Sequence, residues 1–328
     1  MADTDIQALA DRIVGQHALT FLPPSGQALV PQPVPQPLLH TQLLDQPVYL
    51  AALQACSRLG FIAIDAQCLA QAWQRQTLRT GHFDAAHWPD DPEDFGMLDA
   101  MHTANHASAF AACPRELGLY AVLPDAQWVG RMARMGVPTV QLRFKSEDRA
   151  AIGREVQAAV AAVQGTGARL FINDHWREAM DAGAYGIHLG QEDLDALLTD
   201  EDDNTVLHTI QAAGLRLGVS THGYAEMLRA HAVQPSYIAL GAVFPTTLKQ
   251  MATAPQGLAR LRAYARLMQM SPLCYPLVAI GGISADLLAA VRATGVGSVA
   301  VVRALVNAEN PEIAAQHLLA CMQQDCTA

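Results

Sequence analysis

The chain contains little of what nucleic-acid binding or membrane insertion requires. Among its 328 residues, Lys and Arg total 21 against 31 Asp and Glu. No run of basic residues of the kind that grips a phosphate backbone occurs. No apolar run approaches the roughly 20 residues needed to cross a bilayer. The composition therefore excludes a nucleic-acid partner and a membrane span, and it favours small-molecule partners.

The cysteines also lack a pattern. Six are scattered along the chain without the paired spacing of a metal ribbon. The first residues, Met-Ala-Asp-Thr-Asp, carry acid where a secretory signal carries base. We therefore expect a cytoplasmic protein. The oligomeric state is left open by the sequence, a homo-oligomer included.

The composition and the hydrophobic pattern of the sequence change near residue 115. Residues 1–114 hold ten of the 18 prolines, including the alternating stretch 30–37, which predicts an extended spacer. Apolar residues that recur at three and four places predict helices. The predicted helices are 3–16, 48–59, 66–80 and 98–112. We therefore predict a mainly helical, proline-rich N-terminal domain over 1–114, to which the sequence assigns no role.

From residue 115 to 328, short Val/Ile/Leu runs alternate with longer Ala-rich amphipathic stretches. Eight runs are predicted strands: 117–123, 139–143, 169–173, 186–189, 215–220, 237–241, 277–280 and 299–302. Eight strand and helix units over roughly 210 residues match a closed (β/α)8 TIM barrel of the α/β class. The rival, a doubly wound open sheet, normally carries a Gly-x-Gly-x-x-Gly turn after its first strand, where this chain has Leu-Pro-Asp-Ala at 123–126. We therefore predict the barrel.

Three polar side chains alternate with apolar ones at the end of the second predicted strand: Gln141, Arg143 and Lys145. Alternate residues of a strand share a face, so an amide, a guanidinium and an ammonium group point together. A charge near the end of a buried strand needs a partner. We therefore predict an anion clamp, in which Arg supplies a planar fork and Lys a point charge. The alternative is that both charges are surface groups that leave the strand.

The next two predicted strands are followed by amide and acidic residues, Asn173-Asp174 and Gln191-Glu192-Asp193. Neighbouring strands lie about 4.8 Å apart, so carboxylates from adjacent strand ends can meet on one cation. Mg²⁺ commonly keeps one or two protein carboxylates beside substrate phosphates. We predict that Asp174 and Asp193 are its ligands. The alternative for each is helix capping, since each stands before a predicted helix.

The last three predicted strands lead into segments suited to a phosphate. The sixth runs into residues 244–251, which carry hydroxyl groups and one Lys, the seventh precedes Gly281-Gly282, and the eighth ends in Val302-Arg303. Barrels often bind phosphate here with backbone amides, and glycine lets an anion approach the main chain closely. A tight turn without a ligand is the alternative.

Six motifs occur in order between residues 115 and 323, about two-thirds of the chain. They are Val-Gln-Leu-Arg-Phe-Lys (140–145), Phe-Ile-Asn-Asp (171–174), Gly-Ile-His-Leu-Gly-Gln-Glu-Asp-Leu (186–194), Gly-Val-Ser-Thr-His (218–222), Ala-Leu-Gly-Ala-Val-Phe-Pro-Thr (239–246) and Val-Ala-Ile-Gly-Gly-Ile (278–283). Through them the sequence resembles the thiamine phosphate synthase family. The resemblance implies a Mg²⁺-dependent transferase that joins 4-amino-5-hydroxymethyl-2-methylpyrimidine diphosphate to a thiazole phosphate. Its products are thiamine phosphate and diphosphate.

The resemblance also implies a role for individual residues. The pyrimidine diphosphate would be held by Gln141, Arg143, Lys145, Asn173, Ser220 and Lys249, of which Arg143, Lys145 and Lys249 neutralise the leaving group. Mg²⁺ would be held by Asp174 and Asp193. The thiazole phosphate would be surrounded by Thr246, Thr247, Leu248, Gly282, Val302 and Arg303.

Two positions depart from the family's pattern. The family's phosphate loop usually has Pro-Thr-x-Thr-Lys, whereas here Leu248 takes the place of the second hydroxyl residue, and Arg303 replaces the usual Ser of the eighth strand. Two alternatives therefore stay open: a barrel resembling a thiazole tautomerase, and a non-catalytic phosphate-binding barrel that serves as a regulatory or interaction module. Retention of the clamp and of both Asp residues favours the synthase. Whether the thiazole is carboxylated also stays open.

Overall fold

The computed structural model describes residues 3–22, 46–97, 109–198, 205–246, 254–271 and 274–323. The chain divides into two compact units. Unit 1 comprises Met1–Asn105, Gly223–Arg229 and Arg266–Cys274, and unit 2 comprises His106–His222, Ala230–Ala265 and Tyr275–Ala328. The domain boundary at residue 114 remains a prediction.

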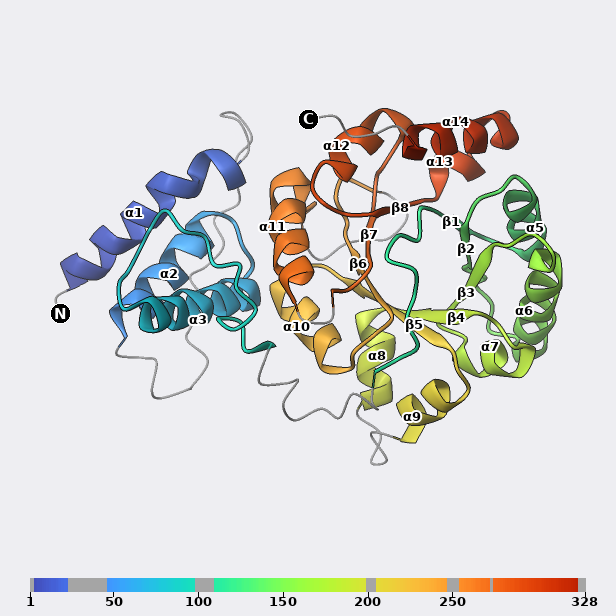
Figure 1. Ribbon diagram of the computed structural model, residues 1–328, viewed down its shortest axis with the longest axis horizontal. Coiled ribbons are helices and arrows are strands. Elements are labelled where there is room, and N and C mark those ends of the chain that lie inside the picture. The colour runs from blue at the N-terminus through green and yellow to red at the C-terminus, as the bar shows by residue number, and fades with distance from the viewer. Residues whose placement is uncertain are drawn as a thin grey trace. The chain divides into compact units, whose positions relative to one another are not determined.

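Unit 2 contains a closed barrel of eight parallel strands in chain order (Figure 1). The strands are β1 (Leu119–Leu123), β2 (Thr139–Leu142), β3 (Arg169–Asn173), β4 (Gly186–Leu189), β5 (Arg216–Thr221), β6 (Tyr237–Leu240), β7 (Leu277–Ile280) and β8 (Ser298–Val301). Each strand pairs with the next, and β8 closes the ring on β1. The predicted (β/α)8 barrel is confirmed, and each predicted strand is present.

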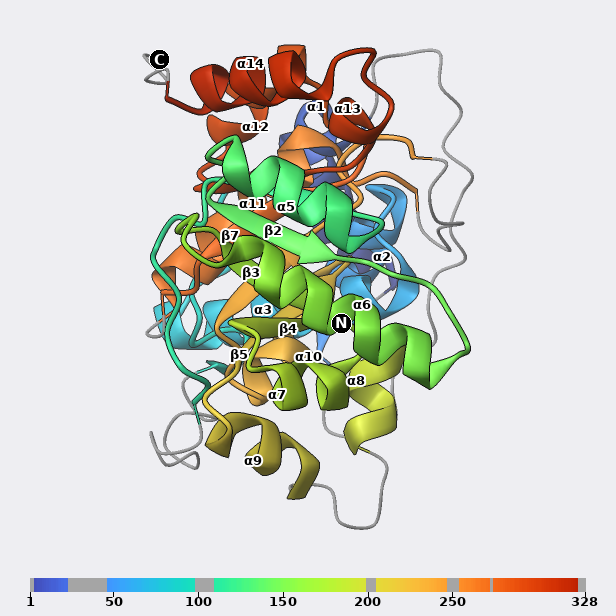
Figure 2. The same ribbon diagram turned by 90° about the vertical axis from the view of Figure 1, so that its right-hand side faces the viewer.

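Helices follow the strands along the chain. They are α5 (Ala126–Arg134), α6 (Arg149–Val163), α7 (Trp176–Ala182), α8 (Gln191–Leu198), α9 (Thr205–Ala212), α10 (Tyr224–Ala232), α11 (Gly257–Met270), η2 (Ala285–Leu287), α12 (Leu288–Arg292), α13 (Arg303–Val306) and α14 (Pro311–Gln323). Figure 2 shows α5 and α6 on the outside of β2 and β3, against which they pack. Side-chain caps fix two starts, because Asp125 accepts the Trp128 N–H at 2.8 Å and Asp148 accepts the Ala150 N–H at 2.9 Å. These two capped starts determine where the loops that follow β1 and β2 end.

The barrel interior is filled by alternate residues of each strand. Its core includes Tyr120, Phe171 and Tyr237, whose rings contact one another with centroids 5.1–5.9 Å apart. Gly218 on β5 makes room for one of these rings, since a Cβ there would lie 2.1 Å from Cζ of Tyr237. The register pairs His188 with Gly218 and Asn173 with His188, so these positions share the inner face. Polar side chains therefore enter an otherwise apolar core.

Unit 1 is built on three helices, α1 (Asp3–Phe21), α2 (Pro47–Arg58) and α3 (Ala63–Thr80). Aromatic side chains pack between them, with Trp88 at 4.5 Å from Phe21 and 5.6 Å from Phe61 by ring centroids. The predicted N-terminal helical region is confirmed over these three helices. The predicted spacer 30–37 lies outside the described residues. Of the predicted helix 98–112, only 109–112 are described, and they are not helical.

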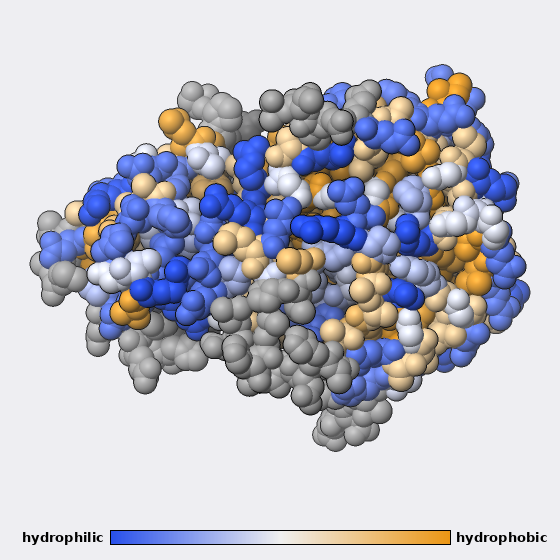
Figure 3. Space-filling view, in the orientation of Figure 1, coloured by the Kyte–Doolittle hydropathy of each residue, from blue (hydrophilic) through white to orange (hydrophobic). Residues whose placement is uncertain are grey.

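Among the described residues, no helix combines the length and the apolar character needed to cross a membrane. Hydrophilic and hydrophobic residues are interspersed over the face that Figure 3 shows. The five cysteines that the structure describes are free thiols.

Candidate functional site

The structure places the predicted site residues at the carboxyl ends of the barrel strands. Those described lie on or within three residues of the end of β2 (Gln141, Arg143, Lys145), β3 (Asn173, Asp174), β5 (Ser220), β7 (Gly282) and β8 (Val302, Arg303). Thr246 lies in the segment that follows β6, and Asp193 lies in the first turn of α8 after β4. Thr247, Leu248 and Lys249 lie outside the described residues. Parallel strands of a closed barrel end at one rim, so the described residues share that rim.

A chain of hydrogen bonds crosses the barrel interior below this rim. Nε2 of Gln141 donates to the hydroxyl of Tyr120 at 3.1 Å, and that hydroxyl lies 2.8 Å from the hydroxyl of Tyr237. The Tyr237 hydroxyl lies 2.7 Å from Nδ1 of His188, whose Nε2 lies 2.8 Å from Oγ of Ser220. Five side chains from five strands are thus joined. The residues at the two ends of this hydrogen-bond chain, Gln141 and Ser220, are predicted substrate-binding residues.

Burial keeps the members of this hydrogen-bond chain uncharged. It raises the pKa of the Tyr120 and Tyr237 hydroxyls well above their usual range. Burial and the positive charge of Arg143 lower the pKa of His188 to about 4. At neutral pH the ring of His188 is therefore a neutral imidazole with one N–H and one acceptor nitrogen.

Asp174 and Asp193 lie in direct contact. Loss of solvation, the negative charge of Asp193 and a hydrogen bond with Asp193 together raise the pKa of Asp174 to about 6, against a partial opposing effect of His175 and Arg143. The backbone of Asp174 is left-handed, with φ 63°. Such a conformation in a residue other than glycine is often found at functional sites.

Helix capping does not explain Asp174. The N-cap of α7 is His175, and it makes no side-chain capping bond. Asp174 stands one position earlier, where its backbone oxygen accepts the Trp176 N–H at 2.9 Å. Its carboxylate is therefore available for another partner, and two adjacent carboxylates form a donor set that suits a divalent cation.

The segment after β2 brings Arg143 close to the acidic pair. Arg143 is half-buried, and its charge acts on both Asp174 and His188. The Arg143 N–H donates to the Leu123 carbonyl at 2.8 Å, and His175 Nε2 lies 3.1 Å from the Phe144 carbonyl. Arg143 thus faces the site, whereas Lys145 is exposed at its edge.

The ends of β6 and β7 are packed together. The Phe244 N–H donates to the Gly281 carbonyl at 3.0 Å. A Cβ on Gly282, whose φ is 67°, would lie 2.6 Å from the Pro245 carbonyl oxygen. Glycine is therefore required here to bring the two loops into contact. On the next strand end, Arg303 begins the four-residue helix α13.

A cavity of about 170 Å³ opens beside the acidic pair. It is lined by Arg149, Ile152, Asp174, His175, Trp176, Arg177 and Glu178. Within the described part of the chain, no group of three or more His, Cys, Asp or Glu side chains could hold a metal ion. A cation at Asp174 and Asp193 would therefore depend on oxygen atoms from a substrate or water to complete its coordination.

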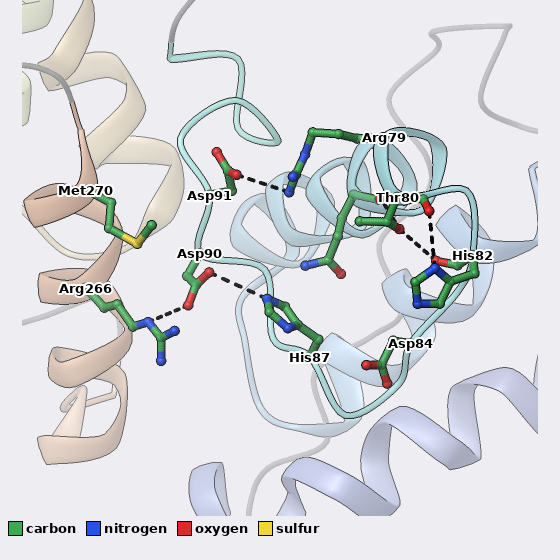
Figure 4. Close-up of a pocket in the computed structure, with 10 residues that line it drawn as sticks. Arg79, Thr80, His82, Asp84, His87, Asp90, Asp91, Arg266 and Met270 are labelled. Carbon is green, nitrogen blue, oxygen red and sulfur yellow. Dashed lines mark hydrogen bonds and ion pairs between the residues drawn. The ribbon is translucent and has the colours of Figure 1, made fainter.

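A second cavity, of about 350 Å³, lies in unit 1 (Figure 4) and is lined by Gln76, Arg79, Thr80, His82, Asp84, His87, Asp90, Asp91, Arg266 and Met270. Its charges are largely paired with each other, as Arg79 lies 3.2 Å from Asp91 and Arg266 lies 2.5 Å from Asp90. Because these charges are paired with each other, the lining of the cavity favours no particular class of ligand, and we assign none.

Sequence reasoning missed three members of the hydrogen-bond chain, Tyr120, His188 and Tyr237. The available signal was alternation. His188 stands between the apolar residues Ile187 and Leu189 of a buried strand, on the face opposite to theirs. From the sequence, the two tyrosines are indistinguishable from ordinary aromatic core residues, since no neighbouring residue of Tyr120 or Tyr237 indicates that their hydroxyls meet.

Comparison with known proteins agrees with this geometry. The sequence model of the family described as thiamine monophosphate synthase matches residues 119–305. The chain is 55% identical over 196 residues to the thiamine-phosphate synthase of Neisseria meningitidis serogroup B. This match covers 60% of this chain and 90% of that relative. It is 50% identical over 210 residues to that of Serratia proteamaculans, covering 64% of this chain and 93% of the relative.

A solved structure is also similar. The thiamine phosphate pyrophosphorylase of Pyrococcus furiosus superimposes with a TM-score of 0.54 at 27% identity, over 64% of this chain and 97% of that one. Each of these relatives is matched over 90% or more of its own length, whereas each match covers 60–64% of this chain.

Proposed function

Because the chain belongs to the thiamine monophosphate synthase family, we propose that it couples 4-amino-5-hydroxymethyl-2-methylpyrimidine diphosphate to a thiazole phosphate, with thiamine phosphate and diphosphate as products. The observation that carries this proposal is the 55% identity over 90% of a named thiamine-phosphate synthase. At that identity, a transferase activity of the same type is supported for the barrel. The small-molecule substrates follow from the reaction, and we place the protein in the cytoplasm with them.

The rim residues provide the groups that this reaction needs. Gln141, Asn173 and Ser220 lie on the inner face of the barrel, where they can bind the pyrimidine end of the substrate. We assign the diphosphate to Arg143 and Lys145, together with Lys249. The thiazole phosphate is assigned to the ends of β6, β7 and β8, the usual phosphate position in a barrel. The assigned residues there are Thr246, Thr247, Leu248, Gly282, Val302 and Arg303.

The acidic pair fits a divalent cation. Burial raises the pKa of Asp174, and the negative charge of Asp193 and the hydrogen bond with it raise this pKa further. We propose Asp174 and Asp193 as ligands of Mg²⁺, which prefers oxygen donors and takes few protein ligands beside phosphates. When bound, this cation would neutralise charge on the diphosphate.

The covalent step exchanges one bond for another. The bond between the pyrimidine methylene carbon and the diphosphate oxygen breaks, and its electron pair leaves with the diphosphate. The thiazole nitrogen then supplies the electron pair of the new C–N bond. The amino-pyrimidine ring can stabilise positive charge on the methylene carbon, so a dissociative route requires no protein nucleophile. Arg143 and the lysines stabilise the leaving group, and the barrel aligns the two substrates and excludes water.

The test is to incubate the purified full-length chain with both substrates and Mg²⁺ and to quantify thiamine phosphate and diphosphate. We expect equal amounts of the two products and neither product when one substrate is omitted. Conversion of a thiazole carboxylate isomer without coupling would identify a tautomerase instead. Binding of the phosphorylated substrates without any product at saturation would identify a non-catalytic phosphate-binding barrel.

A further inference from the structure

The hydrogen-bond chain from Gln141 to Ser220 has a direction, which follows from counting its hydrogens. The amide nitrogen Nε2 of Gln141 can only donate hydrogen bonds, so Oη of Tyr120 is the acceptor in their 3.1 Å contact. Among the described residues, the Tyr120 hydroxyl has one further partner, the Tyr237 hydroxyl at 2.8 Å. Tyr120 is almost fully buried at 1% exposure, so its hydrogen must be donated to Tyr237 if it is to be satisfied.

The remaining hydrogens then follow in order. The Tyr237 hydroxyl accepts from Tyr120, so its own hydrogen goes to Nδ1 of His188 at 2.7 Å. A neutral imidazole that accepts at Nδ1 carries its hydrogen on Nε2, and this N–H donates to Oγ of Ser220 at 2.8 Å. The hydroxyl hydrogen of Ser220 has no role within the chain and is free for a ligand.

The reverse direction is unfavourable. If Ser220 donated to Nε2 and Nδ1 donated to Tyr237, the hydrogen of Tyr237 would go to Tyr120. The hydrogen of Tyr120 would then be buried without an acceptor, a state that costs on the order of a lost hydrogen bond. The forward direction gives an acceptor to the hydroxyl hydrogens of both tyrosines and to the N–H of His188.

The same counting fixes the amide of Gln141. One hydrogen of its Nε2 is engaged by Tyr120, which orients the amide, and its Oε1 has no partner among the described residues. A ligand above the barrel core therefore meets an acceptor at Gln141 and a donor at Ser220. The pyrimidine diphosphate of the proposed reaction carries complementary groups, an amino group that donates and phosphate oxygens that accept.

We propose that Tyr120, Tyr237 and His188 are positioning residues that present Ser220 as a hydrogen-bond donor and Gln141 as an acceptor to the pyrimidine diphosphate. This inference rests on the proposed function. Tyr237 and His188 orient the hydroxyl of Ser220, because His188 donates to its oxygen and leaves its hydrogen for a ligand. Tyr120 orients the amide of Gln141.

Tyr237→Phe tests the proposal, because it removes both the donor to His188 and the acceptor for Tyr120. The imidazole can then carry its hydrogen on either nitrogen, and the hydroxyl of Ser220 is no longer directed. We expect the KM for the pyrimidine diphosphate to rise about tenfold or more, the loss of one hydrogen bond to a charged group, with the KM for the thiazole phosphate within about twofold. Tyr120→Phe should disturb Gln141 alone.

A double-mutant cycle separates positioning from packing. Ser220→Ala should cost about tenfold or more in kcat/KM in the wild type and in Tyr120→Phe, but less than about twofold in Tyr237→Phe, where the hydroxyl is already misdirected. His188→Leu, which removes the N–H that donates to Ser220, should remove the effect of Ser220→Ala in the same way. This second background keeps the test valid if Tyr237→Phe does not fold.

Tyr275→Phe is the matched control. It removes another buried hydroxyl, which lies 2.9 Å from Nδ1 of His231, at a position outside the proposed site. Its two KM values should equal those of the wild type. An equal cost of Ser220→Ala in the wild type, Tyr237→Phe and His188→Leu would overturn the proposal. A wild type that makes no thiamine phosphate would instead refute the proposed function.

Discussion

Asp174→Asn should raise the stability of the protein and abolish its activity, two effects of opposite sign. The carboxylates of Asp174 and Asp193 lie in contact, and the pKa of Asp174 is raised from 3.8 to about 6. At pH 7.5, above this pKa, the folded state without a divalent cation holds an ionised Asp174 that is partly desolvated and lies beside the negative charge of Asp193. Asparagine keeps the shape of the side chain and tolerates the left-handed backbone with φ 63°.

The magnitude is set by the exposure of Asp174. Asp174 is exposed to solvent, which screens the repulsion, so we expect a gain of about 1 kcal/mol in the free energy of unfolding. For a domain of the size of the barrel, that corresponds to an increase of roughly 2–4 °C in Tm. Asp148→Asn is the control, because that exposed residue caps α6 and asparagine caps equally well.

The pH dependence of the metal-free wild type has the corresponding sign. The folded state holds the proton of Asp174 up to pH of about 6, whereas the unfolded state releases it near 3.8. The folded state thus binds more protons in this window, and stability falls as pH rises from about 4 to about 6. Asp174→Asn should lack this decline.

The assay is thermal unfolding at pH 5 and pH 7.5, with and without Mg²⁺, alongside the rate of thiamine phosphate formation. Mg²⁺ should raise the Tm of the wild type more than that of Asp174→Asn, since a ligand stabilises the state that binds it. A variant that is less stable than the wild type at pH 7.5, or that keeps normal Mg²⁺-dependent turnover, would refute the reasoning about the acidic pair.

Three further substitutions have distinct expected results. Arg143→Gln should lower kcat/KM about 100-fold, because it removes a charge that stabilises the leaving group. Gly218→Ala should lower Tm by several degrees, since its Cβ would lie 2.1 Å from the ring of Tyr237 and overpacking commonly costs about 1–3 kcal/mol. Arg79→Met should destabilise unit 1 by about 3 kcal/mol in denaturant unfolding, because it leaves the carboxylate of Asp94, 1% exposed, without its 2.6 Å partner.

Each of these results has a clear contrary. Normal turnover in Arg143→Gln would place the diphosphate elsewhere. An unchanged Tm in Gly218→Ala would mean that the ring of Tyr237 can move aside at little cost. Unchanged unfolding of Arg79→Met would mean that Asp94 is not dependent on the guanidinium.

The barrel could be predicted because its strands carry a strong local signal. Runs such as 169–173 and 277–280 are short, apolar and separated by longer amphipathic stretches, and they are strands in the structure with the same bounds. Two helices of the barrel, α9 and α13, were not predicted. α13 has only four residues, too few for a helical period to be recognised, and α9 follows directly on residues that the structure does not describe.

The site could be predicted in part for a related reason. Parallel strands end at one rim, so the position of Gln141, Asp174 or Ser220 at a strand end places it near the others without knowledge of contacts. The contacts themselves could not be predicted. The hydroxyls of Tyr120 and Tyr237 meet across the barrel at a separation of 117 residues, and only closure of the eight strands brings them together.

The most direct test of the account is an experimental structure of the full-length protein with thiamine phosphate, diphosphate and Mg²⁺. We predict diphosphate beside Arg143 and Lys145, a cation bound by both Asp174 and Asp193, and Oγ of Ser220 within hydrogen-bond distance of a ligand oxygen. Products bound at a different end of the barrel, or a cation that contacts neither carboxylate, would contradict the account.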